Sequence, residues 1–276
     1  MKIDSDDVVR NTSEAKNQDS CIASGLTLYA WESYDIAGAL EGVFCSVIDS
    51  TSGAVFQSAT LIDATAINPR CLRLGPNPTL FYLDTSASPY VMKTVQVDIN
   101  NPISFNSSST IVSTVNATNS NYDVAINSAD ADAGNAVFAY NSSASNTLGV
   151  GYIDTDGVVG GPPTGFPAAV TVGSTNSNDL ITICTDQVNT DPTDSERIYV
   201  AYSSRTASAG LKIKRFKGIL TVEATHTVEA SATEIKGASI IVTQAGDLQI
   251  IYTMSATNTY DYQVKGALYD VSADTM

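Results

Sequence analysis

The stretch that decides the fold is Leu-Thr-Leu-Tyr-Ala-Trp-Glu-Ser at 26–33, because segments of the same kind recur along the chain. Each is rich in aliphatic and aromatic residues and ends in serine, and the terminal serines follow one another at 53, 57, 61 and 51 residues. A period of about 50 residues is typical of repeat architectures built from small sheets. The other four segments are Thr79–Ser86, Ala136–Ser143, Arg197–Ser204 and Leu248–Ser255.

The third and fifth positions of these segments are apolar, starting with Leu28 and Ala30. Alternate residues of a strand share one face, so we expect these two columns to form the buried side. A second apolar run follows each segment after a polar loop, and in four repeats a third run and then a short strand precede the next segment. Four meandering strands per repeat are typical of a β-propeller blade.

The sequence therefore predicts an all-β fold: a five-bladed β-propeller with four antiparallel strands per blade, in a single domain over residues 1–276. The last repeat lacks its outermost strand, whereas an unassigned run, Asp6–Arg10, precedes the first repeat. A strand at Asp6–Arg10 that completes the last blade would close the ring and remove a free sheet edge. A slice of a larger propeller is the alternative. The predicted repeats span approximately 19–62, 68–112, 120–172, 178–228 and 237–276 plus 6–10.

Composition restricts the partners. The net charge of −15 opposes binding to nucleic acid or to an anionic membrane, since both need clustered cations. The basic residues of Leu211–Lys217 alternate with apolar ones, as on the solvent face of a strand, with a polyanion site as the alternative. No apolar stretch reaches the length of a membrane helix, and Met1–Arg10 does not resemble a signal peptide.

Neither a cofactor nor a metal is predicted. The single histidine, His226, excludes a histidine metal cluster, and the glycine pairs lack the pattern of a phosphate loop. The cysteines show no Cys-x-x-Cys pair, so we expect small buried thiols, with a Cys21–Cys71 bridge as the alternative. Trp31 is predicted to pack between blades, with sugar stacking as its alternative role.

Carboxylates are the remaining candidates for chemistry. Asp19, Asp123 and Asp179 lie at or near the starts of predicted innermost strands. Five-bladed propellers resemble, as a class, certain glycoside hydrolases whose acidic residues project from innermost strands into a central tunnel and act as paired carboxylates. The resemblance implies a carbohydrate-active alternative, a lectin or a glycosidase using these aspartates. Asp also opens turns for conformational reasons alone.

A second resemblance is to the propeller repeats of tail structural proteins of tailed bacteriophages, including nozzle-type proteins. It is carried by Leu28–Glu32, by Ser46–Asp49 with Ser52–Val55, and by Pro69–Gly75. It implies a non-enzymatic structural or docking module without catalytic residues. The prediction is accordingly a virion component whose partners are other virion or structural proteins; the alternatives are an extracellular location and a surface carbohydrate as partner.

Overall fold

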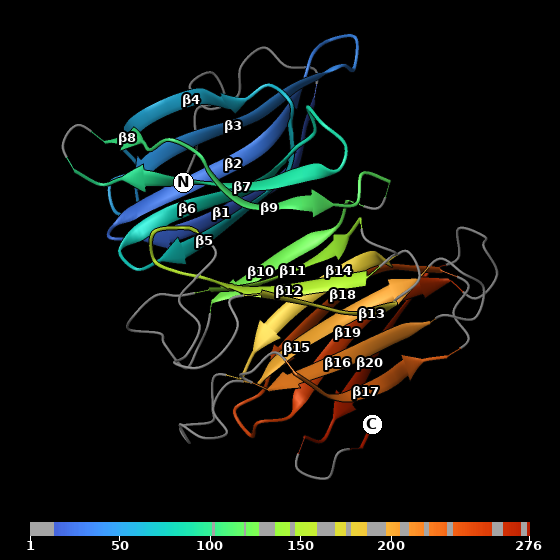
Figure 1. Ribbon diagram of the computed structural model, residues 1–276. Coiled ribbons are helices and arrows are strands. Elements are labelled where there is room, and N and C mark those ends of the chain that lie inside the picture. Colours follow the sequence, from blue (N-terminus) through green and yellow to red (C-terminus); the bar gives the residue numbers. More distant parts are fainter. Residues whose placement is uncertain are drawn as a thin grey trace. The chain divides into compact units, whose positions relative to one another are not determined.

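The computed structural model describes residues 14–100, 103–118, 120–126, 136–143, 147–158, 169–174, 178–186, 197–204, 210–217, 221–230, 234–255, 262–271 and 275–276. Within these ranges the regular elements are β-strands that pair antiparallel, which confirms the all-β prediction (Figure 1). These ranges contain no helix long and apolar enough to cross a membrane. The chain forms two compact units, one of residues 1–117 with 154–158 and the other of the remaining residues.

The first unit contains two sets of consecutively paired strands. The first set runs in the order β1-β2-β3-β4, and the second in the order β5-β6-β7-β9, with β8 paired to β7. The bounds are β1 (Glu14–Ala23), β2 (Leu26–Tyr34), β3 (Leu40–Asp49), β4 (Val55–Asp63), β5 (Ala66–Leu74), β6 (Asn77–Asp84), β7 (Tyr90–Asp98), β8 (Ser104–Phe105) and β9 (Ser109–Val115).

The second unit repeats this layout. Its strands pair as β10-β11-β12-β13, β14-β15-β16-β17 and β18-β19-β20. The bounds are β10 (Tyr122–Ile126), β11 (Ala136–Ser142), β12 (Thr147–Ile153), β13 (Ala169–Ser174), β14 (Asn178–Thr185), β15 (Ile198–Ser204), β16 (Leu211–Lys217), β17 (Thr221–Glu229), β18 (Glu234–Val242), β19 (Leu248–Ser255) and β20 (Gln263–Tyr269).

The number of sheets differs from the prediction. In the described residues the strands belong to four hydrogen-bonded sheets, whereas five separate four-stranded sheets were expected. The last sheet has three described strands, and the predicted closing strand Asp6–Arg10 lies outside the described residues. The first strand of one set contacts the first strand of the next: β1 lies beside β5 in the first unit, and β14 lies beside both β10 and β18 in the second. Contacts between successive innermost strands are a feature of propellers.

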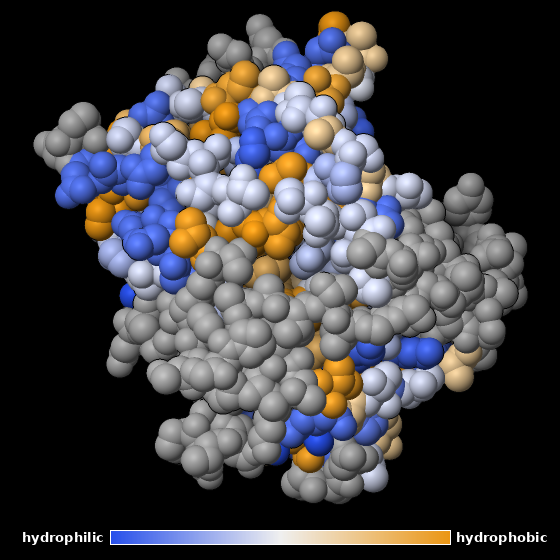
Figure 2. All heavy atoms as spheres, viewed as in Figure 1, coloured by the Kyte–Doolittle hydropathy of each residue, from blue (hydrophilic) through white to orange (hydrophobic). Residues whose placement is uncertain are grey.

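The central strands are buried on both faces. Leu28 and Ala30 of β2 join a core with Leu80 and Tyr82 of β6, and the neighbouring Trp31 is also buried. The hydrophobic effect of this burial is the main stabilising term of each unit. Figure 2 shows hydrophilic and hydrophobic residues interspersed over the described part of the visible surface.

The predicted alternation needs a correction in the second and third repeats. The core around Leu28 and Ala30 contains Leu80 and Tyr82 of β6, whereas the predicted column contained Phe81 and Leu83, which are also buried. Val137 and Ala139 of β11 join the core with β14–β16, whereas the predicted column contained Phe138 and Tyr140. A shift of one residue exchanges the two faces of a strand. Because Phe138 and Tyr140 are also buried, β11 has apolar residues on both faces. Aligning the terminal serines therefore does not show which face of the strand joins this core.

Candidate functional site

Four innermost strands, β1, β5, β14 and β18, have an irregularity near their starts, whereas β10 pairs with β11 in continuous register. Pairing shifts register between Lys16 and Asp19 in β1 and between Ile67 and Arg70 in β5. In the second unit β14 shifts between Asn178 and Leu180, and β18 between Ile235 and Gly237. Such bulges leave a residue unpaired and re-aim side chains, and they are common beside active sites. The residues at these shifts include Asn17, Asn68, Asp179 and Lys236.

Two asparagines occupy the shifts of the first unit. Asn17 and Asn68 have positive φ angles of 47° and 52°, a left-handed conformation that asparagine tolerates better than most residues. The Asn17 side-chain amide donates to Oδ1 of Asn68 at 3.3 Å, so the two strands present a joined pair of amide side chains. Asn17 is exposed and Asn68 half-buried, which leaves this pair accessible to a polar ligand.

A buried carboxylate lies against this pair. Glu32 of β2 is only 2% exposed, and its Oε1 accepts hydrogen bonds from Nδ2 of Asn17 at 2.8 Å and from the backbone N–H of Asn68 at 2.6 Å. Its Oε2 accepts from the Tyr34 hydroxyl at 2.8 Å. All of these partners donate, as an ionised carboxylate requires. Glu32, Asn17, Asn68 and Tyr34 are called the Glu32 site below.

Tyr34 serves this site as a donor. Burial, followed by the hydrogen bond to Glu32 and the negative charge of Glu32, raises the pKa of Tyr34 to about 12. The hydroxyl therefore keeps its proton at neutral pH. The Lys16 ammonium lies 4.4 Å from the centre of the Tyr34 ring, within the range of a cation–π interaction.

The predicted aspartates have a different role from the one expected. Oδ2 of Asp19 accepts the backbone N–H of Cys71 on β5 at 2.8 Å, and Oδ1 accepts the N–H of Ser20 at 2.8 Å. Oδ2 of Asp123 accepts the N–H of Ile183 on β14 at 3.0 Å. Both carboxylates thus tie an innermost strand to the next one instead of projecting freely. Asp179 lies on β14, and its side chain is outside the described residues.

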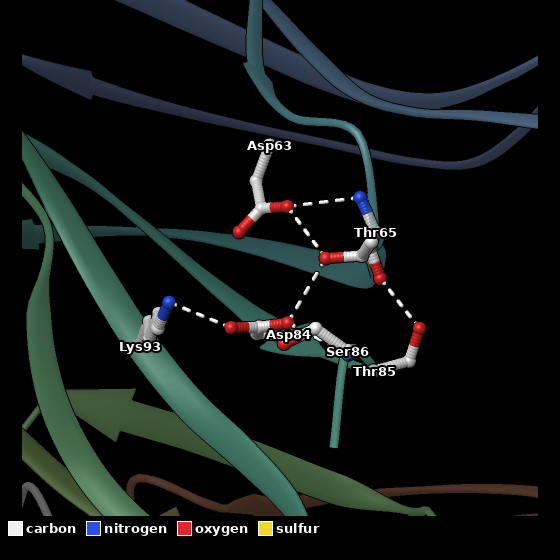
Figure 3. Close-up of polar contacts among 6 residues, drawn as sticks. All are labelled: Asp63, Thr65, Asp84, Thr85, Ser86 and Lys93. Atoms are coloured by element: carbon white, nitrogen blue, oxygen red, sulfur yellow. Dashed lines mark hydrogen bonds and ion pairs between the residues drawn. The ribbon is translucent and has the colours of Figure 1, made fainter.

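A second polar network ties the two strand sets of the first unit together at the ends of β4 and β6 (Figure 3). The Thr65 hydroxyl contacts both Asp63 Oδ1 at 2.8 Å and Asp84 Oδ1 at 2.9 Å, and Lys93 pairs with Asp84 at 2.7 Å. Burial opposes ionisation of Asp84, but hydrogen bonds from Lys93, Ser86 and Thr65 outweigh it and hold the pKa well below its usual range. In the second unit, Lys265 of β20 pairs with Glu229 at the end of β17 at 3.0 Å.

The remaining residues considered in the sequence, which are Trp31, the cysteines and the basic strand, lie in packed or ion-paired surroundings. Trp31 is 4% exposed and its ring lies 6.2 Å from that of Phe44 on the adjacent strand β3, so the side chain is buried, while packing between blades stays a prediction. The cysteines are free thiols, so the alternative of a Cys21–Cys71 bridge is not what the structure shows. On the basic strand, Nε of Arg215 lies 3.1 Å from Glu223. The described residues contain no group of at least three side chains suited to a metal ion.

Sequence reasoning did not select Glu32 as a candidate, although it lies within the predicted strand at 26–33. The signal was available: Glu32 continues the alternation of the buried Leu28 and Ala30, so it falls on a buried face. A carboxylate at such a position requires donors or a function.

No protein-family model matches the sequence, and no curated protein matches it. Solved structures do. A protein of unknown function from Dyadobacter fermentans has a TM-score of 0.58 at 11% identity, over 93% of this chain and 76% of that one. An exo-β-1,3-galactanase from Phanerochaete chrysosporium, solved with galactose, has a TM-score of 0.53 at 11% identity, over 98% of this chain and 64% of that one. A GH43 β-1,3-galactosidase, solved with galactodeoxynojirimycin, has a TM-score of 0.51 at 11% identity, over 94% of this chain and 92% of that one.

These likenesses show the β-propeller fold and correct the functional prediction. The neighbours with a named activity are glycoside hydrolases, and no relation to phage tail proteins is shown. The predictions of a non-enzymatic structural module and of a virion component are therefore wrong on this finding. The carbohydrate-active alternative is the one that the comparisons favour.

Proposed function

We propose that the protein is a five-bladed β-propeller that hydrolyses a glycosidic bond, with the Glu32 site as part of its active site. The number of blades is supported by the five recurrent strand segments and by the contacts between successive innermost strands within each unit. The reaction class is supported by the activities named for the two glycosidases of similar fold. The partner is then a glycan, and an extracellular location, the alternative predicted from the sequence, goes with this function.

The observation that carries the proposal is the carboxylate pair on the β1–β5 interface. Glu32 accepts the backbone N–H of Asn68, and Asp19 accepts that of Cys71. These amides are three residues apart on β5, which at about 3.3 Å for each strand residue corresponds to roughly 10 Å or less. Glycoside hydrolases place their two carboxyl groups roughly 5 to 9.5 Å apart.

The surrounding groups suit a sugar. The Asn17 and Asn68 amides offer both donors and acceptors, which is the set that recognises hydroxyl groups. Because Glu32 receives donors only, it fits the ionised partner of the pair, which activates water or stabilises positive charge, rather than the acid. Asp19 receives backbone donors as well, so in this scheme it would need to exchange one of them before donating a proton.

The test is release of reducing sugar from a panel of galactans, arabinans and their oligosaccharides by the wild type and by Glu32→Gln. We expect turnover of at least one substrate, reduced about 100-fold or more in Glu32→Gln, the usual effect of removing an acid or base. Asp123→Asn is the matched control, because Asp123 has the tethering role without a neighbouring Glu32 site, and it should keep the activity. No hydrolysis and no glycan binding across the panel would overturn the proposal, as would an unaffected Glu32→Gln.

A further inference from the structure

The β1–β5 interface also carries two thiols. Cys21 on β1 is half-buried and Cys71 on β5 is buried, and both pack in one core with Cys45. Cys71 is held against β1 at two points: its N–H donates to Oδ2 of Asp19 at 2.8 Å, and its thiol donates to the Asp19 carbonyl at 3.7 Å. Asp19 is two residues before Cys21, so Cys71 is held beside the Cys21 side chain.

The two thiols are chemically unequal. The interaction between the two thiols lowers the pKa of Cys21 and raises that of Cys71. Burial raises the pKa values of Cys45 and Cys184. Thiolate character and access together determine which cysteine reacts. Cys21 combines both, and Cys71 is its adjacent partner.

From this geometry we infer that Cys21 and Cys71 form a thiol-oxidation site that a small disulfide such as oxidised glutathione converts into a disulfide between β1 and β5. The Cys21 thiolate attacks one sulfur of the reagent, forming a mixed disulfide and releasing one thiolate. The Cys71 thiol then loses its proton and attacks the Cys21 sulfur, which releases the second thiolate. The protein loses two electrons and two protons, and the reagent is reduced to two thiols.

The product would join the strands that carry the Asn17–Asn68 pair. A disulfide stabilises mainly by restricting the unfolded chain, and this one would close a loop of about 50 residues, for which a rise in the midpoint of denaturation is expected. The inference is independent of the proposed hydrolase activity, because it rests on the thiols alone.

The test uses the native full chain incubated with oxidised glutathione, then blocked with N-ethylmaleimide. Chymotryptic digestion without reductant cuts after Tyr29 and so separates Cys21 from Cys45 before mass spectrometry. We expect a peptide pair joined through Cys21 and Cys71, with Cys45 and Cys184 unoxidised. In Cys71→Ser the reaction should stop at a glutathione adduct on Cys21.

Three outcomes would overturn the inference. One is a stable glutathione adduct on Cys21 of the wild type without the intramolecular bond. Another is no reaction at either thiol while the chain remains folded by circular dichroism. The third is a Cys21–Cys71 bridge that forms equally fast in denaturant, because the fold would then contribute nothing. Cys45→Ala is the matched control and should leave the bridge unchanged.

Discussion

The interface of β1 with β5 and that of β10 with β14 are built on one plan and differ at one buried position on the strand that pairs with the first of them. In both, an aspartate of the first strand accepts a backbone N–H of the second: Asp19 from Cys71 and Asp123 from Ile183. Asp19 pairs with Ala30, and Asp123 pairs with Ala139. Two residues further along the strand, the first interface has Glu32 and the second has Asn141.

The comparison separates scaffold from candidate chemistry. A feature that recurs between repeats, such as the aspartate tether, serves the packing of one strand against the next. A buried carboxylate present in one interface and replaced by a neutral amide in the other is not required by the repeat. Glu32 is therefore the better functional candidate, although the aspartates have the more conspicuous positions in the sequence.

The largest expected effect comes from moving the carboxylate to the other interface. Asn141 is fully buried. In Asn141→Glu a charge would replace a neutral amide at this fully buried position, and we expect a loss of about 3 kcal/mol or more in the free energy of unfolding. Urea denaturation followed by tryptophan fluorescence and circular dichroism measures it. Wild-type stability in Asn141→Glu would show that the two interfaces solvate a carboxylate equally well.

Removing either tether should have a similar, smaller effect in both interfaces. Asp19→Ala and Asp123→Ala each leave a backbone N–H without its acceptor, which costs about 1–3 kcal/mol. Both variants are compared with the wild type by urea denaturation. Values that differ widely between the two variants would contradict the common plan. Asp98→Ala is the control for loss of a carboxylate that accepts a backbone N–H within an exposed turn and not between two strands.

Acid should weaken the network of Figure 3. The pKa of Asp84 is depressed in the folded chain, so its contribution to stability is present above the unfolded-state value of about 3.9 and is lost as the pH falls below that value toward the folded-state one. We expect Lys93→Met to be less stable than the wild type at pH 7, and we expect this difference in stability to shrink progressively below about pH 4. Denaturation midpoints between pH 7 and pH 2 measure the difference.

The matched variant in the second unit is Lys265→Met. The Lys265 side chain is 39% exposed, against 23% for Lys93. A more exposed ion pair is worth less, so Lys265→Met should destabilise less than Lys93→Met at pH 7. A larger loss of stability in Lys265→Met than in Lys93→Met would mean that exposure does not determine which of the two ion pairs contributes more.

The smallest effect is expected at the edge of the Glu32 site. Tyr34→Phe removes the hydroxyl donor to Oε2 of Glu32 and keeps the ring beneath Lys16. Loss of one such hydrogen bond costs about 1 kcal/mol, and Glu32 retains its asparagine donors. Urea denaturation measures the change, and Tyr90→Phe serves as the control for a hydroxyl outside the site. A loss far above this value would show that Tyr34 alone holds the carboxylate.

Much of the architecture was predictable from local pattern. Alternating apolar residues, polar turns and a repeat near 50 residues identify antiparallel strands in meandering sets, because strand periodicity and turn chemistry depend on residues near one another in the chain. The strands β2, β6, β11, β15 and β19 fall where the five recurrent segments predict them. Which face of β6 and of β11 joins the core of the neighbouring strands did not follow from the pattern, because residues on both faces of these strands are apolar.

The sequence by itself thus determined an all-β chain of repeated antiparallel strand sets, and it indicated that the starts of innermost strands carry polar side chains. Only the tertiary structure decided what those side chains do. Asp19 meets Cys71 across 52 residues, and Glu32 meets Asn68 across 36. Hydrogen bonds of that range depend on which strand lies beside which and in what register, and no local pattern specifies this, because the same aspartate can line an open tunnel or tie two strands together.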